Sequence, residues 1–298
     1  MSSAGVIERE SRFRGADGLE LFARSWRPAA PRGVVVLVHG IGDHSGLYPF
    51  LVEHLVARGW AVHAFDQRGN GRSPGRRGHV ERWALFRDDL AVFVDRVTRA
   101  ERAGSVFLVG NSLGGLLVLD YALARPEGLA GVVAVAPALS LAGVPRALLL
   151  LGRIASVVWP GLSLETGLDL DGIARDRDIA RLILGDPLFH RRATARLSTE
   201  TAAAIDCVLA RANHIRVPTL LLHGGDDRMV PPAGTRAFAR RAPPALVEYR
   251  EYPAAFHALL ADLDREAPLA DLERWLAERS SPQPARPQRN VMRGVDNP

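Results

Sequence analysis

Residues 106–115, VFLVGNSLGG, are the strongest indication of the fold of this chain. They join an apolar run, typical of a buried strand, to the pattern Gly-x-Ser-x-Gly, and a helix-like run follows at residues 116–124. Gly110 and Gly114 fit a strand-to-helix turn so tight that a side chain at either position would clash. Such a turn lifts the Ser112 hydroxyl above the sheet and points the first N–H groups of the helix at the reacting atom. The stretch therefore predicts Ser112 as a nucleophile.

Two further side chains that this chemistry needs follow downstream. A serine hydroxyl becomes a good nucleophile when a base takes its proton, and the base needs a partner that orients it. The apolar run 219–222 leads into a loop with Asp226 and Asp227, and the strand-like run 246–252 leads into a loop with His257. Each of these side chains follows a strand, at the edge where open parallel sheets bind ligands. Their chain order is that of the Ser…Asp…His triad.

Four segments carry a family resemblance. They are residues 38–48 (VHGIGDHSGLY), residues 66–75 (DQRGNGRSPG), the serine turn, and Gly224-x-x-Asp227 followed by His257. In this order they resemble the α/β-hydrolases and, within that fold, the monoacylglycerol lipase and lysophospholipase-like group. The resemblance implies a serine carboxylester hydrolase that forms an acyl-enzyme. Its implied substrate is a lipid with a single acyl chain, a monoacylglycerol or a lysophospholipid.

The resemblance also implies a triad. Ser112 attacks, His257 acts as the base, and Asp227 orients it, because the family pattern Gly-x-x-Asp ends at Asp227. Asp226 is then a turn-forming neighbour. His223 is the second candidate for the base, although its place at a strand end also suits a structural hydrogen bond.

An oxyanion hole needs two donors. The backbone N–H of Leu113, directly after the nucleophile, is one, and the resemblance implies the N–H of Ile41 as the other. His39 and Gly40, which precede Ile41, are candidates for lining the substrate site.

The chain departs from the family pattern at two positions. Asn111 precedes the nucleophile where the family usually has histidine, and Asn70 replaces a histidine in the Arg-Gly-x-Gly loop. Neither position belongs to the triad, so these changes bear on the subfamily and the substrate rather than on the chemistry.

Apolar, strand-like runs alternate with helix-like segments, which is typical of a largely parallel sheet wrapped by helices. A hairpin with Asp17-Gly18 in its turn is predicted before them. The expected strands are 34–38, 61–65, 106–109, 132–136, 219–222 and 246–252, and the helices include 49–58, 84–101 and 269–278. We therefore predict an α/β class and the α/β-hydrolase fold, with a mostly parallel central sheet flanked by helices and an inserted helical cap.

The cap is predicted from a break in the alternation. About 80 residues before the run at 217 have helical but no clear strand character, which is far longer than a simple crossover. The expected organisation is a core at 1–138 with residues 1–10 loose, a helical cap at 139–216, the rest of the core at 217–279, and a disordered tail at 280–298.

Within the expected cap, residues 144–159 are unusually apolar, with Arg146 and Arg153 as the only charges. Two interpretations remain open. The run is a helix packed on the main domain, or it is an exposed apolar surface that docks transiently on a membrane or walls an acyl tunnel. Leu149 and Leu150 are candidates for lining the substrate site.

Composition excludes several other classes. Arginine supplies all 38 basic residues against 33 acidic ones, so Schiff-base chemistry at a lysine and a P-loop lysine are both excluded. A single cysteine, with no signal-peptide pattern and no apolar run of membrane-spanning length, predicts a cytoplasmic protein. Neither metal-ligand spacing nor a nucleic-acid-binding motif is present, so we expect no metal, no cofactor and no nucleic-acid partner.

Other activities fit parts of the pattern. A general short-chain carboxylesterase, a peptidase or an acyltransferase would use the same triad. Residues 40–46 followed by Asp66 imitate a dinucleotide-binding fingerprint, but the glycine spacing is wrong and Ser112, Asp227 and His257 would have no role. A non-catalytic binding protein of this fold is disfavoured by the intact triad pattern.

Overall fold

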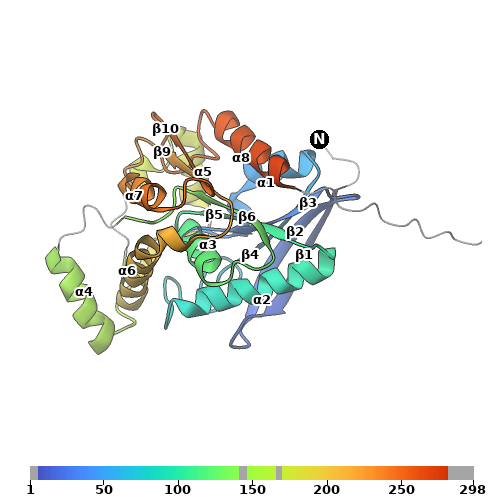
Figure 1. Cartoon of the computed structure of the whole chain (residues 1–298). Coiled ribbons are helices and arrows are strands. Elements are labelled where there is room, and N and C mark those ends of the chain that lie inside the picture. Colours follow the sequence, from blue (N-terminus) through green and yellow to red (C-terminus); the bar gives the residue numbers. More distant parts are fainter. Residues whose placement is uncertain (1–5, 141–145, 166–169, 281–298) are drawn as a thin grey trace, which may run out of the picture.

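The computed structural model of this protein describes residues 6–140, 146–165 and 170–280 (Figure 1). Its strands are β1 (Val6–Arg14), β2 (Glu20–Pro28), β3 (Gly33–Val38), β4 (Trp60–Phe65), β5 (Val106–Asn111), β6 (Leu129–Val135), β7 (Ser163–Glu165), β8 (Arg192–Thr194), β9 (Thr219–Gly224) and β10 (Val247–Tyr252). Eight of them form one sheet in the order β1-β2-β4-β3-β5-β6-β9-β10. β1 and β2 pair antiparallel with their neighbours, and the remaining pairs are parallel.

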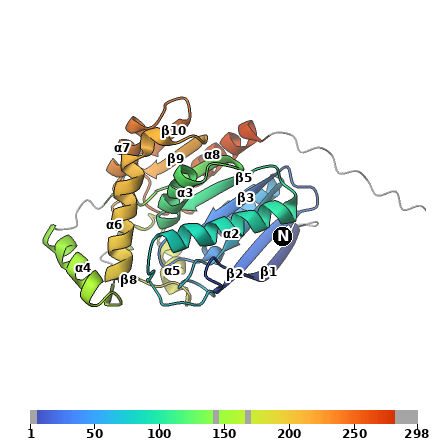
Figure 2. The same cartoon turned by 60° about the horizontal axis from the view of Figure 1, so that its bottom comes forward.

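Helices cover both faces of this sheet (Figures 1 and 2). They are α1 (Pro49–Ala57), α2 (Ala84–Glu101), α3 (Leu113–Ala124), α4 (Arg146–Val158), α5 (Arg177–Gly185), α6 (Ala195–Ala210), α7 (Ala233–Arg241) and α8 (Glu266–Arg279), with short 3₁₀ turns η1 (Ser45–Leu47), η2 (Leu170–Gly172) and η3 (Ala212–His214). α1 and α8 pack on one face, and α2, α3, α6 and α7 pack on the other. The predicted α/β-hydrolase fold, with its mostly parallel sheet between helical layers, is confirmed.

The central strand β3 shows why the two layers form. Val34, Val36 and Val38 belong to the core under α2 and α3, whereas Val35 and Leu37 belong to the core under α1 and α8. Successive side chains of a strand point to opposite faces, so one continuous apolar run feeds both cores. All six residues of β3 are buried, as expected for a parallel strand covered on both sides.

β1 corrects the expectation that residues 1–10 are loose. Residues 6–10 pair with β2, and Asp17-Gly18 lie in the turn between the two strands, as predicted. Most side chains of β1 are exposed, and its charges pair across to β2, where Arg24 lies 3.3 Å from Glu8 and 3.4 Å from Glu10. Such a strand lacks the apolar alternation by which a sequence reveals a half-buried strand. Residues 1–5 lie outside the described part.

The chain between β6 and β9 contains α4, α5 and α6; we call its residues 146–165 and 170–216 the insert. β7 and β8 were not predicted. They form a small antiparallel sheet with strands of three residues each, which are too short to show a period. α6 places Leu197, Ile205 and Val208 in the same core as α2 and α3, so part of the insert is packed into the main domain. Residues 141–145, 166–169 and 281–298, which include most of the predicted tail, lie outside the described part.

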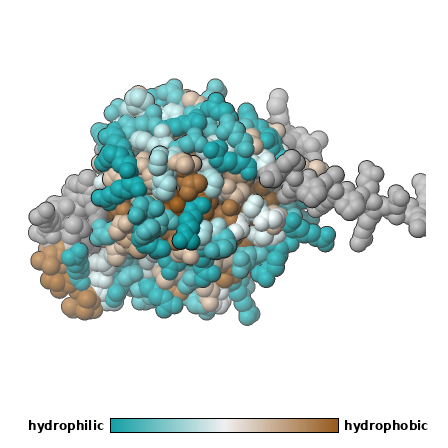
Figure 3. Space-filling view, in the orientation of Figure 1, coloured by the Kyte–Doolittle hydropathy of each residue, from teal (hydrophilic) through white to brown (hydrophobic). Residues whose placement is uncertain are grey.

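α4 projects from the body beside α6 (Figures 1 and 2). Its inner side is joined to α6 where the hydroxyls of Ser156 and Thr199 lie 2.9 Å apart, and its outer side forms an apolar patch at one end of the molecule (Figure 3). Among the described residues, none of the helices has both the length and the apolar character needed to cross a membrane. The exposed apolar residues of α4 and its end are Leu150, Leu151, Ile154, Val157, Val158 and Trp159.

Candidate active site

Ser112 stands in the sharp turn between β5 and α3, where the sequence predicts it. Its φ of 53° and ψ of −116° are seldom adopted by residues other than glycine. The turn is over-determined by backbone hydrogen bonds, because the Ser112 N–H donates to the Val135 carbonyl at 2.9 Å and its carbonyl accepts from the Leu116 N–H at 3.1 Å. The serine side chain is therefore held in a strained position at the carboxyl end of the sheet.

Gly110 and Gly114 are required by close backbone contacts. A Cβ atom on Gly110 would lie 2.2 Å from the carbonyl oxygen of Gly114, and one on Gly114 would lie 2.2 Å from the carbonyl oxygen of Val38. A side chain at Gly110 would push α3 away from β5, and one at Gly114 would push α3 away from β3, so the glycines of the motif allow the turn to form.

Asp227 and His257 meet at the ends of β9 and β10. The Nδ1 atom of His257 lies 2.7 Å from Oδ2 of Asp227, and both side chains are buried. An ionised carboxylate only accepts, so Nδ1 carries the proton and the Nε2 atom of the neutral ring is left as a hydrogen-bond acceptor. The other carboxylate oxygen accepts from the N–H groups of Met229 at 3.0 Å and Val230 at 2.8 Å. Asp226, the alternative acid, is exposed.

The two side chains shift each other's protonation. Burial alone would raise the pKa of Asp227, but the charge of His257 and hydrogen bonds from His223, His257 and the Val230 N–H outweigh it and hold that pKa well below its usual value. Burial lowers the pKa of His257, but the charge and hydrogen bond of Asp227, with a contribution from Asp43, raise it above 6.5. The pair is thus arranged to stabilise a positive charge on His257.

Ser112, His257 and both expected oxyanion donors line one cavity of about 1110 Å³. Leu113 is the first residue of α3, so its N–H has no acceptor within the helix. Ile41 is fixed on both sides, because the N–H of Gly40 donates to the hydroxyl of Tyr48 at 3.1 Å and the carbonyl of Gly42 accepts from the His190 N–H at 3.1 Å. The geometry brings the loop after β3 to the nucleophile.

Only some of the residues predicted to line the substrate site lie at the cavity of Ser112. Gly40 lines the cavity, but His39 is not among the lining residues; its ring is buried and bonds to the Gly40 carbonyl at 2.7 Å and the Gln67 N–H at 2.9 Å. Leu150 and Leu151 are both exposed, and of the two it is Leu151 that lines the cavity. The side chain of Leu149 lies outside the part that the structure describes.

Sequence reasoning missed two polar residues beside Ser112. Asp43 and Tyr48 both line the cavity, and the Tyr48 hydroxyl donates to Asp43 at 2.6 Å. Burial and the charge of Asp43 raise the pKa of Tyr48 well above 10, so its hydroxyl keeps its proton. Both residues stand in the segment 38–48, where polar side chains after the expected oxyanion donor were the available signal.

The two asparagines that depart from the family pattern have different partners. Asn111 forms a side-chain hydrogen bond with Tyr48. The Oδ1 atom of Asn70 lies 3.0 Å from Nε2 of His190, which belongs to the insert. Asn70 therefore joins the Arg-Gly-x-Gly loop to the insert.

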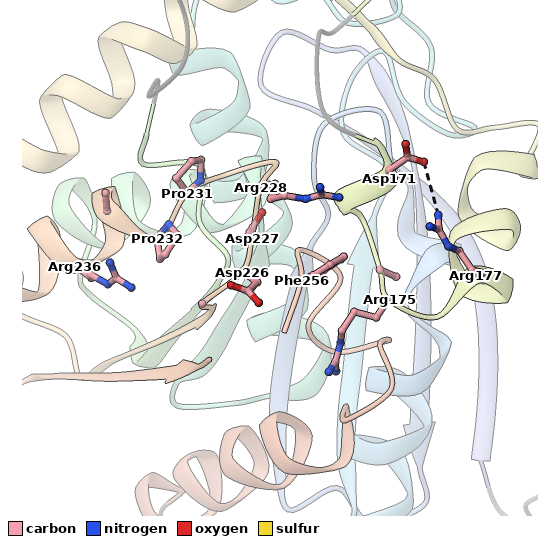
Figure 4. A pocket seen from close by; sticks show the side chains of 13 residues that line it. Asp171, Arg175, Arg177, Asp226, Asp227, Arg228, Pro231, Pro232, Arg236 and Phe256 are labelled. Carbon is pink, nitrogen blue, oxygen red and sulfur yellow. Dashed lines mark ion pairs between the residues drawn. The ribbon is translucent and has the colours of Figure 1, made fainter. Parts of the chain in front are cut away.

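A second cavity, of about 800 Å³, lies against the other side of the Asp227 loop (Figure 4). Arg228, directly after the acid, stacks over Phe256, directly before His257, with 5.5 Å between the guanidinium carbon and the ring centre. This contact joins the two loops that carry the acid and the base. The other arginines of the cavity, Arg175, Arg177 and Arg236, form ion pairs with carboxylates.

The described residues contain no group of three or more histidine, cysteine, aspartate or glutamate side chains arranged to hold a metal ion. Ser112 and His257 line the cavity of about 1110 Å³, and Asp227, which lines the second cavity, contacts His257. A serine, a histidine and an aspartate are the residue types that acyl transfer through a serine nucleophile uses.

Comparison with known proteins gives the site a context. A model of the family described as serine aminopeptidase, S33, matches residues 29–264. The monoacylglycerol lipase of Mycolicibacterium smegmatis is 29% identical over 270 residues, covering 90% of this chain and 96% of its own.

Two solved structures are similar over almost the whole fold. The monoacylglycerol lipase of Paleococcus ferrophilus has a TM-score of 0.80 and 34% identity, covering 88% of this chain and 100% of its own. A soluble variant of monoglyceride lipase from Saccharomyces cerevisiae, in complex with a substrate analog, has a TM-score of 0.82 and 25% identity, covering 94% of this chain and 97% of its own.

Proposed function

This chain belongs to the serine aminopeptidase S33 family and has the α/β-hydrolase fold. We therefore propose that it hydrolyses the ester bond of a lipid with one acyl chain, and that a monoacylglycerol is the first candidate for this lipid. Its relatives include enzymes named monoacylglycerol lipase, and it is a serine hydrolase of that lipid-ester type. The observation that carries the proposal is the hydrogen bond of 2.7 Å between Asp227 and His257 at a cavity that also holds Ser112.

The proposed reaction begins with acylation. His257 removes the proton of the Ser112 hydroxyl through Nε2 while the serine oxygen attacks the ester carbonyl. Asp227 stabilises the imidazolium that forms, and the N–H groups of Ile41 and Leu113 hold the negative oxygen of the tetrahedral intermediate. The intermediate collapses when His257 gives its proton to the leaving alcohol, and an acyl ester on Ser112 remains.

Deacylation repeats these steps with water. His257 takes a proton from water as the water oxygen attacks the acyl carbonyl, and it returns the proton to Ser112 when the intermediate collapses. The products are the fatty acid and the alcohol, so the net reaction consumes one water molecule for each ester bond.

The cavity supports an acyl chain as the substrate group. Its size exceeds that of most small-molecule sites, which is what a long flexible chain requires. Asp43 and Tyr48 line the cavity near Ser112, polar side chains of the insert such as Glu165 and Asp206 line it as well, and much of the remaining wall is apolar. The apolar lining includes Phe50, Ile173, Ile183, Phe189, Met229 and Leu260.

Asp43 and Tyr48 support an alcohol group that carries further hydroxyls. Their oxygens lie at the end of the cavity that holds Ser112, where the carboxylate can accept a hydrogen bond from a substrate hydroxyl. A glycerol ester has such hydroxyls, whereas a simple alkyl ester has none.

We also propose that the exposed side of α4 makes transient contact with a lipid surface. Val157 is 78% exposed and Val158 is 79% exposed, and the patch lies beside the cavity because Leu151 of the same helix lines it. An apolar surface next to the entrance would bring a water-insoluble substrate to the site.

One observation favours a second candidate, the removal of an N-terminal residue from a peptide. The matching family is described as a serine aminopeptidase, and a carboxylate such as Asp43 inside the cavity can pair with an α-ammonium group. Amide and ester substrates distinguish the two candidates.

The test compares purified wild type with Ser112→Ala on p-nitrophenyl esters from acetate to palmitate, 1-oleoylglycerol, a lysophospholipid and an aminoacyl p-nitroanilide. We expect wild type to prefer medium or long chains and to cleave the glycerol ester, and Ser112→Ala to be inactive. Turnover of acetate and butyrate alone would reduce the function to a short-chain esterase. Turnover of the anilide alone would favour the aminopeptidase.

A further inference from the structure

His223 is a buried histidine that the mechanism above does not use. It stands at the end of β9 with no exposed surface and is not among the residues lining the cavity of Ser112. Its Nε2 atom lies 3.2 Å from Oδ2 of Asp227 and 2.8 Å from the Val230 carbonyl oxygen. A second imidazole thus faces the same carboxylate oxygen that His257 contacts.

Hydrogen-bond chemistry fixes which nitrogen of His223 carries the proton. The Val230 carbonyl can only accept, so Nε2 is protonated, and its N–H is shared between that carbonyl and Asp227. In the neutral ring, Nδ1 accepts a hydrogen bond from the hydroxyl of Thr235, which lies 2.8 Å away. Thr235 is itself fully buried in the first turn of α7, so its hydroxyl is held against His223.

Asp227 therefore has donors on both oxygens. Oδ1 accepts from two backbone N–H groups, and Oδ2 accepts from His257 at 2.7 Å and His223 at 3.2 Å. Rotation of the carboxylate would break bonds on both sides at once, in a dry site where an unpaired charge is costly. The second imidazole also takes part of the negative charge that would otherwise act on His257 alone.

We propose that His223 is a positioning residue for the acid of the triad, and that Thr235 holds the ring of His223, in the tautomer that the Val230 carbonyl sets, so that Nε2 can donate to Asp227. The proposal rests on the function proposed above, because it assigns Asp227 and His257 to catalysis. It defines a chain of contacts, Thr235–His223–Asp227–His257, that runs from α7 to the cavity.

The charged groups around His223 come from three elements. Asp227 follows β9, His257 follows β10, and Glu251 on β10 is the register partner of His223. Glu251 is paired with Arg236 of α7 at 2.5 Å. These groups are unchanged when residue 223 is varied, so a change in the pH profile reports on the N–H donor alone.

The experiment compares His223→Leu, which removes the donor, with His223→Gln, whose amide can donate to Asp227 and accept from Thr235. For His223→Leu we expect kcat to fall on the order of tenfold or more, as for other groups that orient a reacting side chain, with KM little changed. Without the donor, more of the charge of Asp227 acts on His257 and raises its pKa, so the acid limb of the kcat/KM profile moves to higher pH. His223→Gln should restore kcat and return the limb.

A second pair keeps the proposal falsifiable if His223→Leu folds poorly. Thr235→Val removes the hydroxyl with little change in shape, and Thr235→Ser keeps it, so only the first should lower kcat. Melting temperatures of all variants identify a purely structural effect. The proposal is overturned if kcat falls equally in His223→Leu and His223→Gln. It is also overturned if the acid limb of the kcat/KM profile does not move in a well-folded His223→Leu.

The rate at which a fluorophosphonate probe labels Ser112 separates this inference from the substrate assignment, because labelling needs the activated serine but no lipid. If wild type is labelled rapidly but cleaves no lipid ester, the proposed substrate is wrong, and the role proposed for His223 is unaffected. Equal labelling rates in wild type and His223→Leu would sink the inference instead.

Discussion

The backbone N–H of His190 donates to the carbonyl oxygen of Gly42 at 3.1 Å, which ties the insert to the loop of the expected oxyanion donor. The side chain of His190 is anchored in turn by Asn70 at 3.0 Å and by the Gly69 carbonyl at 3.3 Å. Gly42 has a φ of 73°, and a Cβ there would lie 1.9 Å from the His190 carbonyl oxygen, so the two segments fit closely. The position of Ile41 thus depends on the insert as well as on β3.

Asn70→Ala should therefore lower kcat although residue 70 is not in the triad. Loss of one hydrogen bond to His190 costs about 1 kcal/mol. If the activation free energy rises by this amount, kcat falls roughly fivefold. Steady-state kinetics with a glycerol ester measure the effect. Arg72→Ala is the matched control, because Arg72 lies on the same loop and pairs with Glu10, away from the insert. Equal changes in both variants would contradict this coupling.

Asp227→Asn should remove most activity and leave the fold intact. The imidazole would lose the partner that sets its tautomer, and the expected fall in kcat is on the order of 10⁴-fold. Asp226→Asn is the neighbouring control, since Asp226 is exposed, and its activity should stay close to wild type. Circular dichroism of both variants checks folding. The assignment of the acid fails if Asp226→Asn is the inactive variant.

The pH dependence of activity should follow His257. Burial lowers its pKa, but the charge and hydrogen bond of Asp227 raise it above 6.5 overall, and the ring is a base only when neutral. kcat/KM should therefore rise with pH through a midpoint above 6.5. In Asp227→Asn the charge is gone, so the midpoint of the residual activity should move to lower pH. Rates measured by pH-stat decide this, and an unmoved midpoint would speak against the pair.

Gly114→Ala should destabilise the protein strongly. Its Cβ would lie 2.2 Å from a backbone oxygen of β3, and such overpacking costs about 1–3 kcal/mol or more. Gly152→Ala is the control, because a Cβ there meets no atom within 4 Å and the residue lies inside α4. That substitution should stabilise α4 by about 0.5–1 kcal/mol or leave stability unchanged. Urea denaturation gives both values, and a stable Gly114→Ala would contradict the packing argument.

Leu151 and Val157 separate the two proposed roles of α4. Leu151 lines the cavity, so Leu151→Ser should lower the ratio of long-chain to short-chain ester turnover. Val157 is 78% exposed and does not line the cavity, so Val157→Ser should weaken binding to lipid vesicles and leave turnover of a soluble ester unchanged. Ester kinetics and vesicle co-sedimentation are the two measurements. If both variants change both properties equally, the division of roles is wrong.

Local motifs made the centre of the fold predictable. The serine turn constrains its own backbone, and the Gly-x-x-Asp pattern favoured Asp227, which is the aspartate that contacts His257. The catalytic roles of these residues stay predictions. The α/β-hydrolase fold follows from the alternation of apolar runs, and it is confirmed.

Features that depend on contacts between distant segments could not be predicted. The first half of β1 is held by pairing with β2 and by charges, so its sequence carries no apolar period. Whether Leu150 or Leu151 faces the cavity depends on the rotation of α4 against α6, which an almost uniformly apolar run leaves open. The positions of Asp43 and Tyr48 could not be predicted either, because they lie beside Ser112 only through the way the loop after β3 crosses the turn between β5 and α3.

The position of α4 outside the sheet bears on how this enzyme can evolve. The helix contacts α6, through groups such as Ser156 and Thr199, while α6 itself is part of the core under the sheet. Substitutions in α4 can accumulate without disturbing the strands and loops that hold Ser112, Asp227 and His257. With the roles proposed for α4, selection can change the range of substrates through one helix while the residues that hold Ser112, Asp227 and His257 are inherited unchanged.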